Sequence, residues 1–196
     1  MNDTDVTLLA GELPIRRIGL GAMRITGRGV WGPPPDRDAA IALLRHAVDL
    51  GVNFVDTADS YGPDISEELI GEAFHPYPTG LIIGTKGGMV RAGPWQWAIN
   101  GDPAHLRDCV EGSLRRLRTD TIDLYQLHRP DPNIPIEESL GALAWLFRTL
   151  SFAVPIPGTS SPAHLQENVA ALALASRLTP DDIAELATMP TAAGVY

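Results

Sequence analysis

The stretch from Asn53 to Gly62, NFVDTADSYG, constrains the fold more than any other part of the sequence. A short apolar run ends in a carboxylate at Asp56, and small polar residues then lead to Tyr61 ahead of a helical pattern. A strand, a polar loop and a helix form the repeating unit of α/β folds, whose sites lie beyond the carboxyl ends of the strands. We therefore expect an α/β protein with a site at this loop.

Two later apolar runs end in the same way. Residues 81–85 lead to Lys86, and residues 122–127 lead to His128. If the three predicted strands are parallel neighbours, their carboxyl ends meet at one rim. At that rim we expect four polar side chains to converge: Asp56, Tyr61, Lys86 and His128.

Length and charge narrow the classes of protein to consider. The chain has 196 residues, 44% of them hydrophobic, which is enough for one domain with a sizeable core. Its formal net charge of −9 argues against a general nucleic-acid or anionic-membrane surface, because both need a basic field. Cys109 is the single cysteine, and no signal sequence or membrane-length apolar run is recognisable. We expect a single domain over residues 1–196, located in the cytoplasm, without nucleic-acid or membrane partners.

Hydrophobic spacing and capping signals predict the other elements. Those expected in the first 118 residues are a hairpin over 6–15, a strand over 18–23, and helices over 36–50, 66–74 and 102–118. Residues 87–101, which include Trp95 and Trp97, are expected to form a long loop. The arginines of the third helix, among them Arg115 and Arg116, are expected on a solvated face.

The four polar side chains suggest a proton-donating site. A tyrosine can act as a general acid near neutral pH only if neighbouring positive charge lowers its pKa from about 10. Lys86 could supply that charge, and Asp56 within salt-bridge reach would keep the lysine ionised. His128 could orient a carbonyl oxygen. Such a site would protonate an alkoxide developing on a carbonyl carbon, the acid half of a hydride-transfer reduction.

Other interpretations of the same residues remain open. Taken singly, Asp56 could tie its loop, Tyr61 could pack at the loop base and His128 could be structural. A metal-dependent hydrolase or lyase using Asp56, Asp59 and His128 is a further alternative, although Lys86 and the lack of a second histidine ligand count against it. Joint placement at predicted strand ends favours the catalytic interpretation.

A second candidate site follows residues 154–157, a short apolar segment that we expect to form a strand. Gly158 is followed by three hydroxyl side chains at the start of a predicted helix, where free backbone N–H groups form an anion site. A plain serine N-cap would explain Ser161 alone. His164 and Arg177 are the nearby cationic candidates.

Taken together, the motifs resemble those of the aldo-keto reductases. They are GLGAMR (19–24), DTADSYG (56–62), EELIG (67–71), TK (85–86), SLRRL (113–117), DLYQLH (123–128) and IPGTSS (156–161). The resemblance implies an eight-stranded (β/α) barrel of the TIM type and NADPH-dependent reduction of an aldehyde or ketone. It also implies that Tyr61 is the proton donor, with Lys86, Asp56 and His128 completing a tetrad.

The resemblance assigns a cofactor site as well. The residues it implies for cofactor binding are Met23, Arg24, Gly158, Thr159, Ser160, Ser161, His164, Glu167 and Asn168. Many relatives carry arginine where this chain has His164, which leaves the preference for NADPH over NADH open. The implied cofactor is NADPH, with NADH as the second choice.

The chain is short for such a barrel. A complete (β/α)8 barrel needs about 250 residues, and only about five of eight β/α units are recognisable, together with the N-terminal hairpin. An apparent internal deletion near residues 143–146 would remove strands five to seven, together with the side chains that bind the nicotinamide ring in relatives. We expect an incomplete barrel whose open edge is covered by a second copy in a homo-oligomer. A catalytically inactive remnant that binds nucleotide or protein is the alternative.

Overall fold

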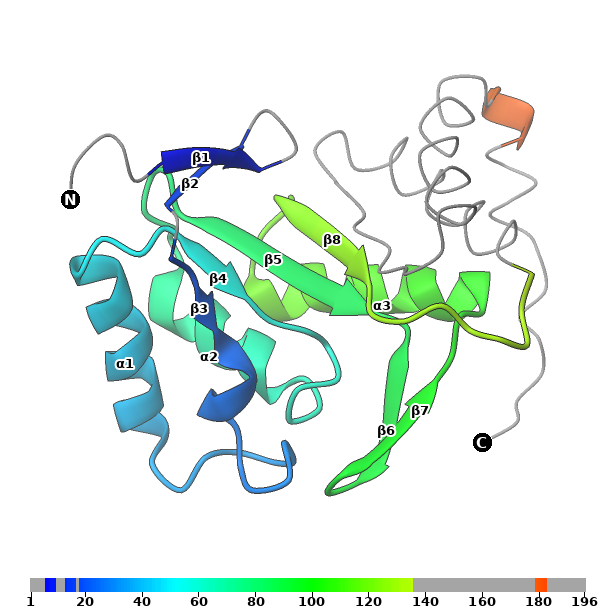
Figure 1. Cartoon of the computed structure of the whole chain (residues 1–196), viewed down its shortest axis with the longest axis horizontal. Coiled ribbons are helices and arrows are strands. Elements are labelled where there is room, and N and C mark those ends of the chain that lie inside the picture. The colour runs from blue at the N-terminus through cyan, green and yellow to red at the C-terminus, as the bar shows by residue number, and fades with distance from the viewer. Residues whose placement is uncertain (1–5, 10–12, 17, 136–178, 183–196) are drawn as a thin grey trace.

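A four-stranded parallel sheet forms the centre of the structure, a computed structural model that describes residues 6–9, 13–16, 18–135 and 179–182 (Figure 1). Its strands, in spatial order, are β3 (Leu20–Gly21), β4 (Phe54–Asp56), β5 (Ile82–Gly87) and β8 (Leu124–Leu127). The helices between them are α1 (Arg37–Asp49), α2 (Ile65–Phe74) and α3 (Pro103–Leu117). The expected α/β fold is confirmed, while the predicted strand near 154–157 and the apparent deletion lie outside the described residues.

Two antiparallel hairpins flank the sheet. The first, β1 (Val6–Leu9) with β2 (Leu13–Arg16), was expected, and Asn53 ties it to the start of β4 by accepting from Arg16 N and donating to Pro14 O. The second, β6 (Met89–Gly93) with β7 (Gln96–Ile99), replaces the long loop expected over 87–101. Figure 1 shows the two hairpins at opposite ends of the sheet, with β6 and β7 at the carboxyl ends of the strands.

The first barrel strand is shorter than expected. Only Leu20 and Gly21 pair with β4, and the chain then enters the 3-10 helix η2 (Ala22–Ile25). Because β4 itself ends at Asp56, no ladder partner is left for residues 22 and 23. Ala22 and Ile25 instead become buried in the core.

The predicted helix starts are confirmed by their caps. The Asp36 side chain accepts from Ala39 N at 2.8 Å, and the Asp102 side chain accepts from Ala104 N and His105 N at 2.9 and 3.0 Å. On α1, Leu43 is 51% exposed although it is apolar. Within the described residues, no helix is long and apolar enough to span a membrane.

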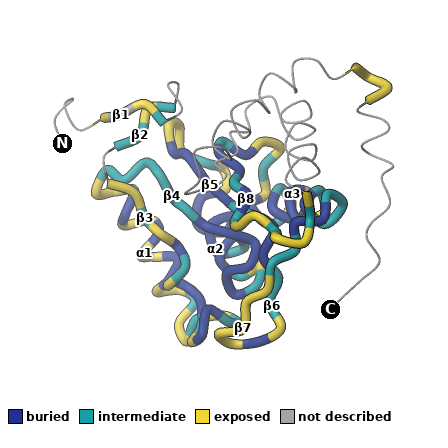
Figure 2. The backbone as a smooth tube through the Cα atoms, turned by 45° about the vertical axis from the view of Figure 1, so that its right-hand side comes forward, coloured by how far each residue is buried: buried dark blue, intermediate teal, exposed yellow. Residues whose placement is uncertain are grey.

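The main core lies between the sheet and the helices. Val55 and Ile83 on the strands pack in one cluster with Leu44, Leu69 and Ile70 on the helices. Figure 2 shows buried backbone along β5 and α2, whereas much of the β6–β7 hairpin is exposed. The opposite face of the sheet carries Phe54 and Leu124 against Gly84, and polar side chains nearer the carboxyl ends of the strands.

A buried ion pair crosses this core. Glu67 on α2 is 0% exposed, accepts from Arg116 Nε at 2.7 Å, and also accepts from the Thr85 hydroxyl. Arg116 makes a second ion pair with Asp64 at 3.2 Å. The expected solvated position of Arg116 was wrong, because sequence spacing does not reveal a partner on another helix.

Candidate active site

Side chains alternate between the two faces along each strand, and this alternation brings the site residues of neighbouring strands together. Asp56 lies opposite Gly84 in the β4–β5 register, and Lys86 lies opposite Gln126 in the β5–β8 register. Because alternate residues share a face, these registers place Asp56, Lys86 and Gln126 on one side of the sheet. That side is opposite the helix-packed face of Val55 and Ile83.

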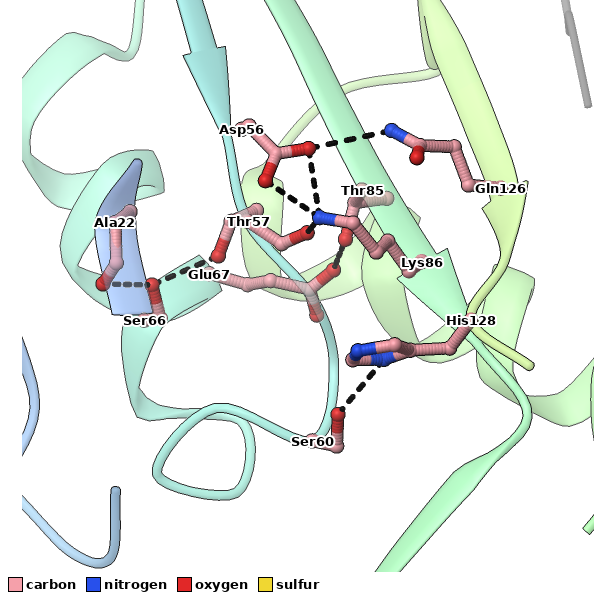
Figure 3. Close-up of polar contacts among 10 residues, drawn as sticks. All are labelled: Ala22, Asp56, Thr57, Ser60, Ser66, Glu67, Thr85, Lys86, Gln126 and His128. Atoms are coloured by element: carbon pink, nitrogen blue, oxygen red, sulfur yellow. Dashed lines mark hydrogen bonds and ion pairs between the residues drawn. The ribbon is translucent and has the colours of Figure 1, made fainter. Parts of the chain in front are cut away.

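Lys86 is held by oxygen atoms from the end of β4 (Figure 3). Its Nζ lies 2.6 Å from both Asp56 carboxylate oxygens and 2.8 Å from the Thr57 carbonyl oxygen. These three acceptors match the three N–H donors of an ammonium group. Gln126 Nε2 donates to Asp56 Oδ1 at 3.2 Å and so fixes the carboxylate from the other side.

Tyr61 lies beside this ion pair. Its ring centroid is 5.5 Å from Lys86 Nζ, and its ring makes edge contacts with His128 and Trp97 at centroid distances of 5.7 and 6.3 Å. Burial, aided by the charges of Asp56 and Asp59, raises the pKa of Tyr61 to about 12. The expected lowering of this pKa is therefore wrong for the described residues, because burial and the two carboxylates act in the opposite direction.

His128 is neutral at physiological pH. Burial, followed by the positive charge of Lys86, lowers its pKa to about 4. The His128 Nδ1 atom lies 3.3 Å from the Ser60 hydroxyl, which leaves Nε2 without a partner among the described residues. The site thus presents a protonated phenol, a neutral imidazole and a neutralised ammonium–carboxylate pair. Such a set can donate hydrogen bonds to a carbonyl oxygen and then a proton.

Sequence reasoning missed several members of this site. Gln126 lies two residues before His128, which directly follows β8, so alternation could have placed the two side chains on one face. Ser60, which contacts His128, and Trp97, which contacts Tyr61, are brought in by loop and hairpin geometry that no spacing signals.

Of the predicted cofactor-binding residues, two are described. Met23 and Arg24 lie in η2, just beyond the carboxyl end of β3, where Met23 packs on the cluster that contains Tyr61 and Arg24 is exposed. The other seven, and Arg177, lie outside the described residues. Within the described part of the chain, no group of three or more His, Cys, Asp or Glu residues could hold a metal ion.

Comparison with known proteins identifies the family. The sequence profile of the aldo/keto reductase family matches residues 17–148. The chain belongs to the aldo-keto reductases. It is 50% identical over 138 residues to an uncharacterised oxidoreductase of Schizosaccharomyces pombe, covering 70% of this chain and 45% of that protein. It is 41% identical over 138 residues to the pyridoxine 4-dehydrogenase of Escherichia coli, covering 69% of this chain and 48% of that protein.

Solved aldo-keto reductase structures share the fold. A glycerol dehydrogenase from Gluconobacter oxydans superposes with a TM-score of 0.73 at 32% identity, over 91% of this chain and 54% of that one. An aldo-keto reductase from Bacillus halodurans in its holo form gives a TM-score of 0.70 at 27% identity, over 85% of this chain and 54% of that one. The chain thus spans about half the length of these relatives, consistent with an incomplete (β/α) barrel. Aldo-keto reductases generally use nicotinamide cofactors.

A second titratable group of this aldo-keto reductase lies in the same loop as Tyr61, with its side chain buried. Asp59 is 7% exposed, and its Oδ1 has no hydrogen-bond partner among the described residues. Burial, with the Glu67 charge adding to it, raises the pKa of Asp59 from 3.8 to about 7, against opposing effects of the Cys109 thiol and Arg116. The carboxyl group is therefore largely protonated below neutral pH.

This raised pKa predicts a pH-dependent stability. Between about pH 4 and 7 the folded chain holds one more proton at Asp59 than the unfolded chain, so this group's stabilisation is lost as pH rises through about 7. Asp59→Asn removes that loss, because an amide does not ionise. We expect the free energy of unfolding of Asp59→Asn, relative to wild type, to increase by about 3 kcal/mol between pH 5 and 8, at roughly 1.4 kcal/mol per pH unit up to pH 7.

Urea unfolding at the two pH values checks this expectation. Asp120→Asn, which neutralises an exposed carboxylate, is the control and should track the wild type at both values. His128 also contributes to the pH dependence of stability, but its contribution cancels in the comparison because both proteins retain it. Parallel pH profiles for wild type and Asp59→Asn would contradict the assignment.

Proposed function

We propose that this chain reduces an aldehyde or ketone to an alcohol with NADPH, and that Tyr61 donates the proton. The observation that carries the proposal is the convergence of Asp56, Tyr61, Lys86 and His128 at the carboxyl ends of neighbouring parallel strands. Family membership supports the reaction class.

The described residues fit the acid half of this reaction. Tyr61 keeps its proton in the physiological range because its pKa is about 12. The proton is proposed to move only as an alkoxide develops on the substrate, because an alkoxide is more basic than a phenolate of this pKa. The neutral His128 can orient the carbonyl oxygen by donating from Nε2, since Nδ1 is occupied by Ser60. Within the Asp56–Lys86 pair, the ammonium group is the member that contacts the tyrosine ring, at 5.5 Å from the ring centroid, and its N–H groups are proposed to favour negative charge developing on oxygen.

The cofactor supplies the hydride when bound. Met23 and Arg24 are the described residues proposed to contact it, since they follow β3 at the same rim as the polar cluster. Residues 158–161, with His164, Glu167 and Asn168, are proposed to hold its adenosine phosphate end. NADPH is proposed over NADH, and the cytoplasm as the location.

Thermal unfolding with and without NADPH tests cofactor binding. A ligand bound only by the folded state adds about 2.7 kcal/mol at 100 times its Kd. For a chain of 196 residues this corresponds to an increase in Tm of about 5 to 10 °C. We expect this shift with NADPH and a smaller one with NADH. Turnover would then be assayed in the oxidative direction with pyridoxine and glycerol, the compounds named in the relatives' descriptions.

The second candidate function is a catalytically inactive module that binds nucleotide or protein. The half-length match to relatives favours it. A Tm shift without turnover would support this candidate, whereas turnover would exclude it. We further propose that a second copy covers the open barrel edge, so that light scattering after size exclusion gives a dimer or larger; a monomer would contradict that arrangement.

A further inference from the structure

Arg91 lies directly opposite Trp97 in the β6–β7 hairpin. Its guanidinium carbon is 3.6 Å from the centroid of the Trp97 ring, within the range of a cation–π contact. The same indole contacts Tyr61 and His128, at centroid distances of 6.3 and 6.4 Å. Arg91 is thus one side chain removed from both predicted catalytic rings.

The hydrogen bonds of Arg91 all go to backbone carbonyl oxygens. Nε donates to Gln96 at 2.9 Å, Nη1 to Val30 at 2.8 Å and Ser60 at 2.9 Å, and Nη2 to Gly29 at 2.9 Å and Gly93 at 3.3 Å. A guanidinium has five N–H donors, and five acceptors are present.

Because all five N–H donors of Arg91 have acceptors, one of two roles for the arginine can be excluded. An arginine beside an active site could bind a carboxylate or phosphate of the substrate, but that role needs free donors. Arg91 has none to offer without breaking a bond to the backbone. Among the described residues, no carboxylate lies within 4.0 Å of it either. Its charge is therefore matched by carbonyl dipoles and by the face of the Trp97 ring.

The five carbonyl groups belong to three separate segments. Gly29 and Val30 lie in the segment between η2 and α1, Ser60 lies in the loop after β4, and the remaining two lie in the hairpin itself. Ser60 also contacts His128 through its hydroxyl, and Tyr61 follows it directly. Arg91 therefore joins three segments that meet beside Tyr61.

We propose that Arg91 is a positioning residue, which clamps these three segments together and holds Trp97 against Tyr61 and His128. The clamp itself depends only on the described contacts. Its effect on turnover rests on the proposed reductase function.

Two backbone amides report directly on the clamp. Gly62 N–H donates to the Val30 carbonyl at 3.3 Å, and Trp95 N–H donates to the Gly29 carbonyl at 3.1 Å. Both carbonyls also accept from Arg91. In Arg91→Lys the charge remains, but a single ammonium can neither reach five acceptors nor stack as a plane on Trp97. We expect these two amides to exchange with solvent at least about tenfold faster, since one hydrogen bond to a charged group is worth that factor or more.

Hydrogen exchange followed by NMR on the full chain makes the measurement. The amide of Ile82, bonded to the Asn53 carbonyl at 2.8 Å, is the internal reference and should keep its rate. Arg28→Lys, at an exposed arginine beside Gly29, is the matched control and should change neither reporter. Unchanged Gly62 and Trp95 amides in Arg91→Lys would overturn the proposal, and so would equal acceleration of Ile82, because that would indicate a loss of overall stability.

Kinetics with 4-nitrobenzaldehyde test the effect on turnover. We expect Arg91→Lys and Trp97→Phe each to lower kcat/KM at least about fivefold, and the double variant to lose little more than the worse single variant, because the two act through one contact. Losses that multiply would overturn the link between Arg91 and Trp97. If the wild-type chain shows no turnover, the reductase function fails, and the exchange rates alone decide whether the clamp exists.

Discussion

Tyr61→Phe is expected to lower kcat/KM for carbonyl reduction by roughly 100- to 10,000-fold, the range contributed by a positioned general acid. Phenylalanine keeps the ring that contacts His128 and Trp97 and loses only the hydroxyl group. No described residue hydrogen-bonds to that hydroxyl, so the fold should lose little stability. The Tm shift produced by NADPH should stay at its wild-type value.

Tyr77→Phe is the matched control for this change. It also removes a tyrosine hydroxyl group. Tyr77 lies just after the C-terminus of α2, and its hydroxyl donates to the Leu117 carbonyl at 2.6 Å. We expect a loss of about 1 kcal/mol in stability without a loss of turnover. Turnover of Tyr61→Phe at more than about a tenth of the wild-type rate would remove Tyr61 from the proton-donor role.

Glu67→Ala should cost about 3–5 kcal/mol of unfolding free energy, the usual effect of removing one partner of a buried ion pair. The carboxylate is fully buried and serves both Arg116 and the Thr85 hydroxyl. Without it, Arg116 retains only the half-exposed Asp64, and the Thr85 hydroxyl is left buried without its acceptor. Denaturant unfolding measures the loss.

Glu68→Ala supplies the control on the same helix. Glu68 is the next residue of α2, is half-buried, and makes no described ion pair. We expect a change within about 0.5 kcal/mol. Equal losses for the two variants would show that the helix, rather than the ion pair, accounts for the effect.

The sequence predicted the elements that depend on local signals. The caps at Asp36 and Asp102 and the parallel strands ending near Asp56 and Lys86 are encoded within a few neighbouring residues. The hairpin over 89–99 escaped prediction because Gly93 and Pro94 interrupt its alternation and Trp95 adopts a left-handed φ of 63° at its turn.

The sequence predicted which four side chains form the site, but it did not predict their charges and pKa values. Strand ends brought together the four expected side chains, because parallel strands share a rim. The pKa of Tyr61 depends on how deeply the ring is buried and on how near Asp56 and Asp59 lie, neither of which sequence spacing gives. Arg116 illustrates the same limit, since its partner Glu67 is 49 residues away in sequence.

Because side chains alternate along a strand, each strand residue contributes either to the core under the helices or to the polar face. Along β5, Ile83 and Thr85 serve the packed helices, whereas Gly84 and Lys86 serve the polar face. Core residues and site residues thus alternate along the strand. We expect a substitution on one face to leave the side chains of the other face in place. A shift of one residue in β5 would exchange the two faces. The ammonium group would then point at Glu67 beneath α2, and a threonine hydroxyl would take the place beside Asp56.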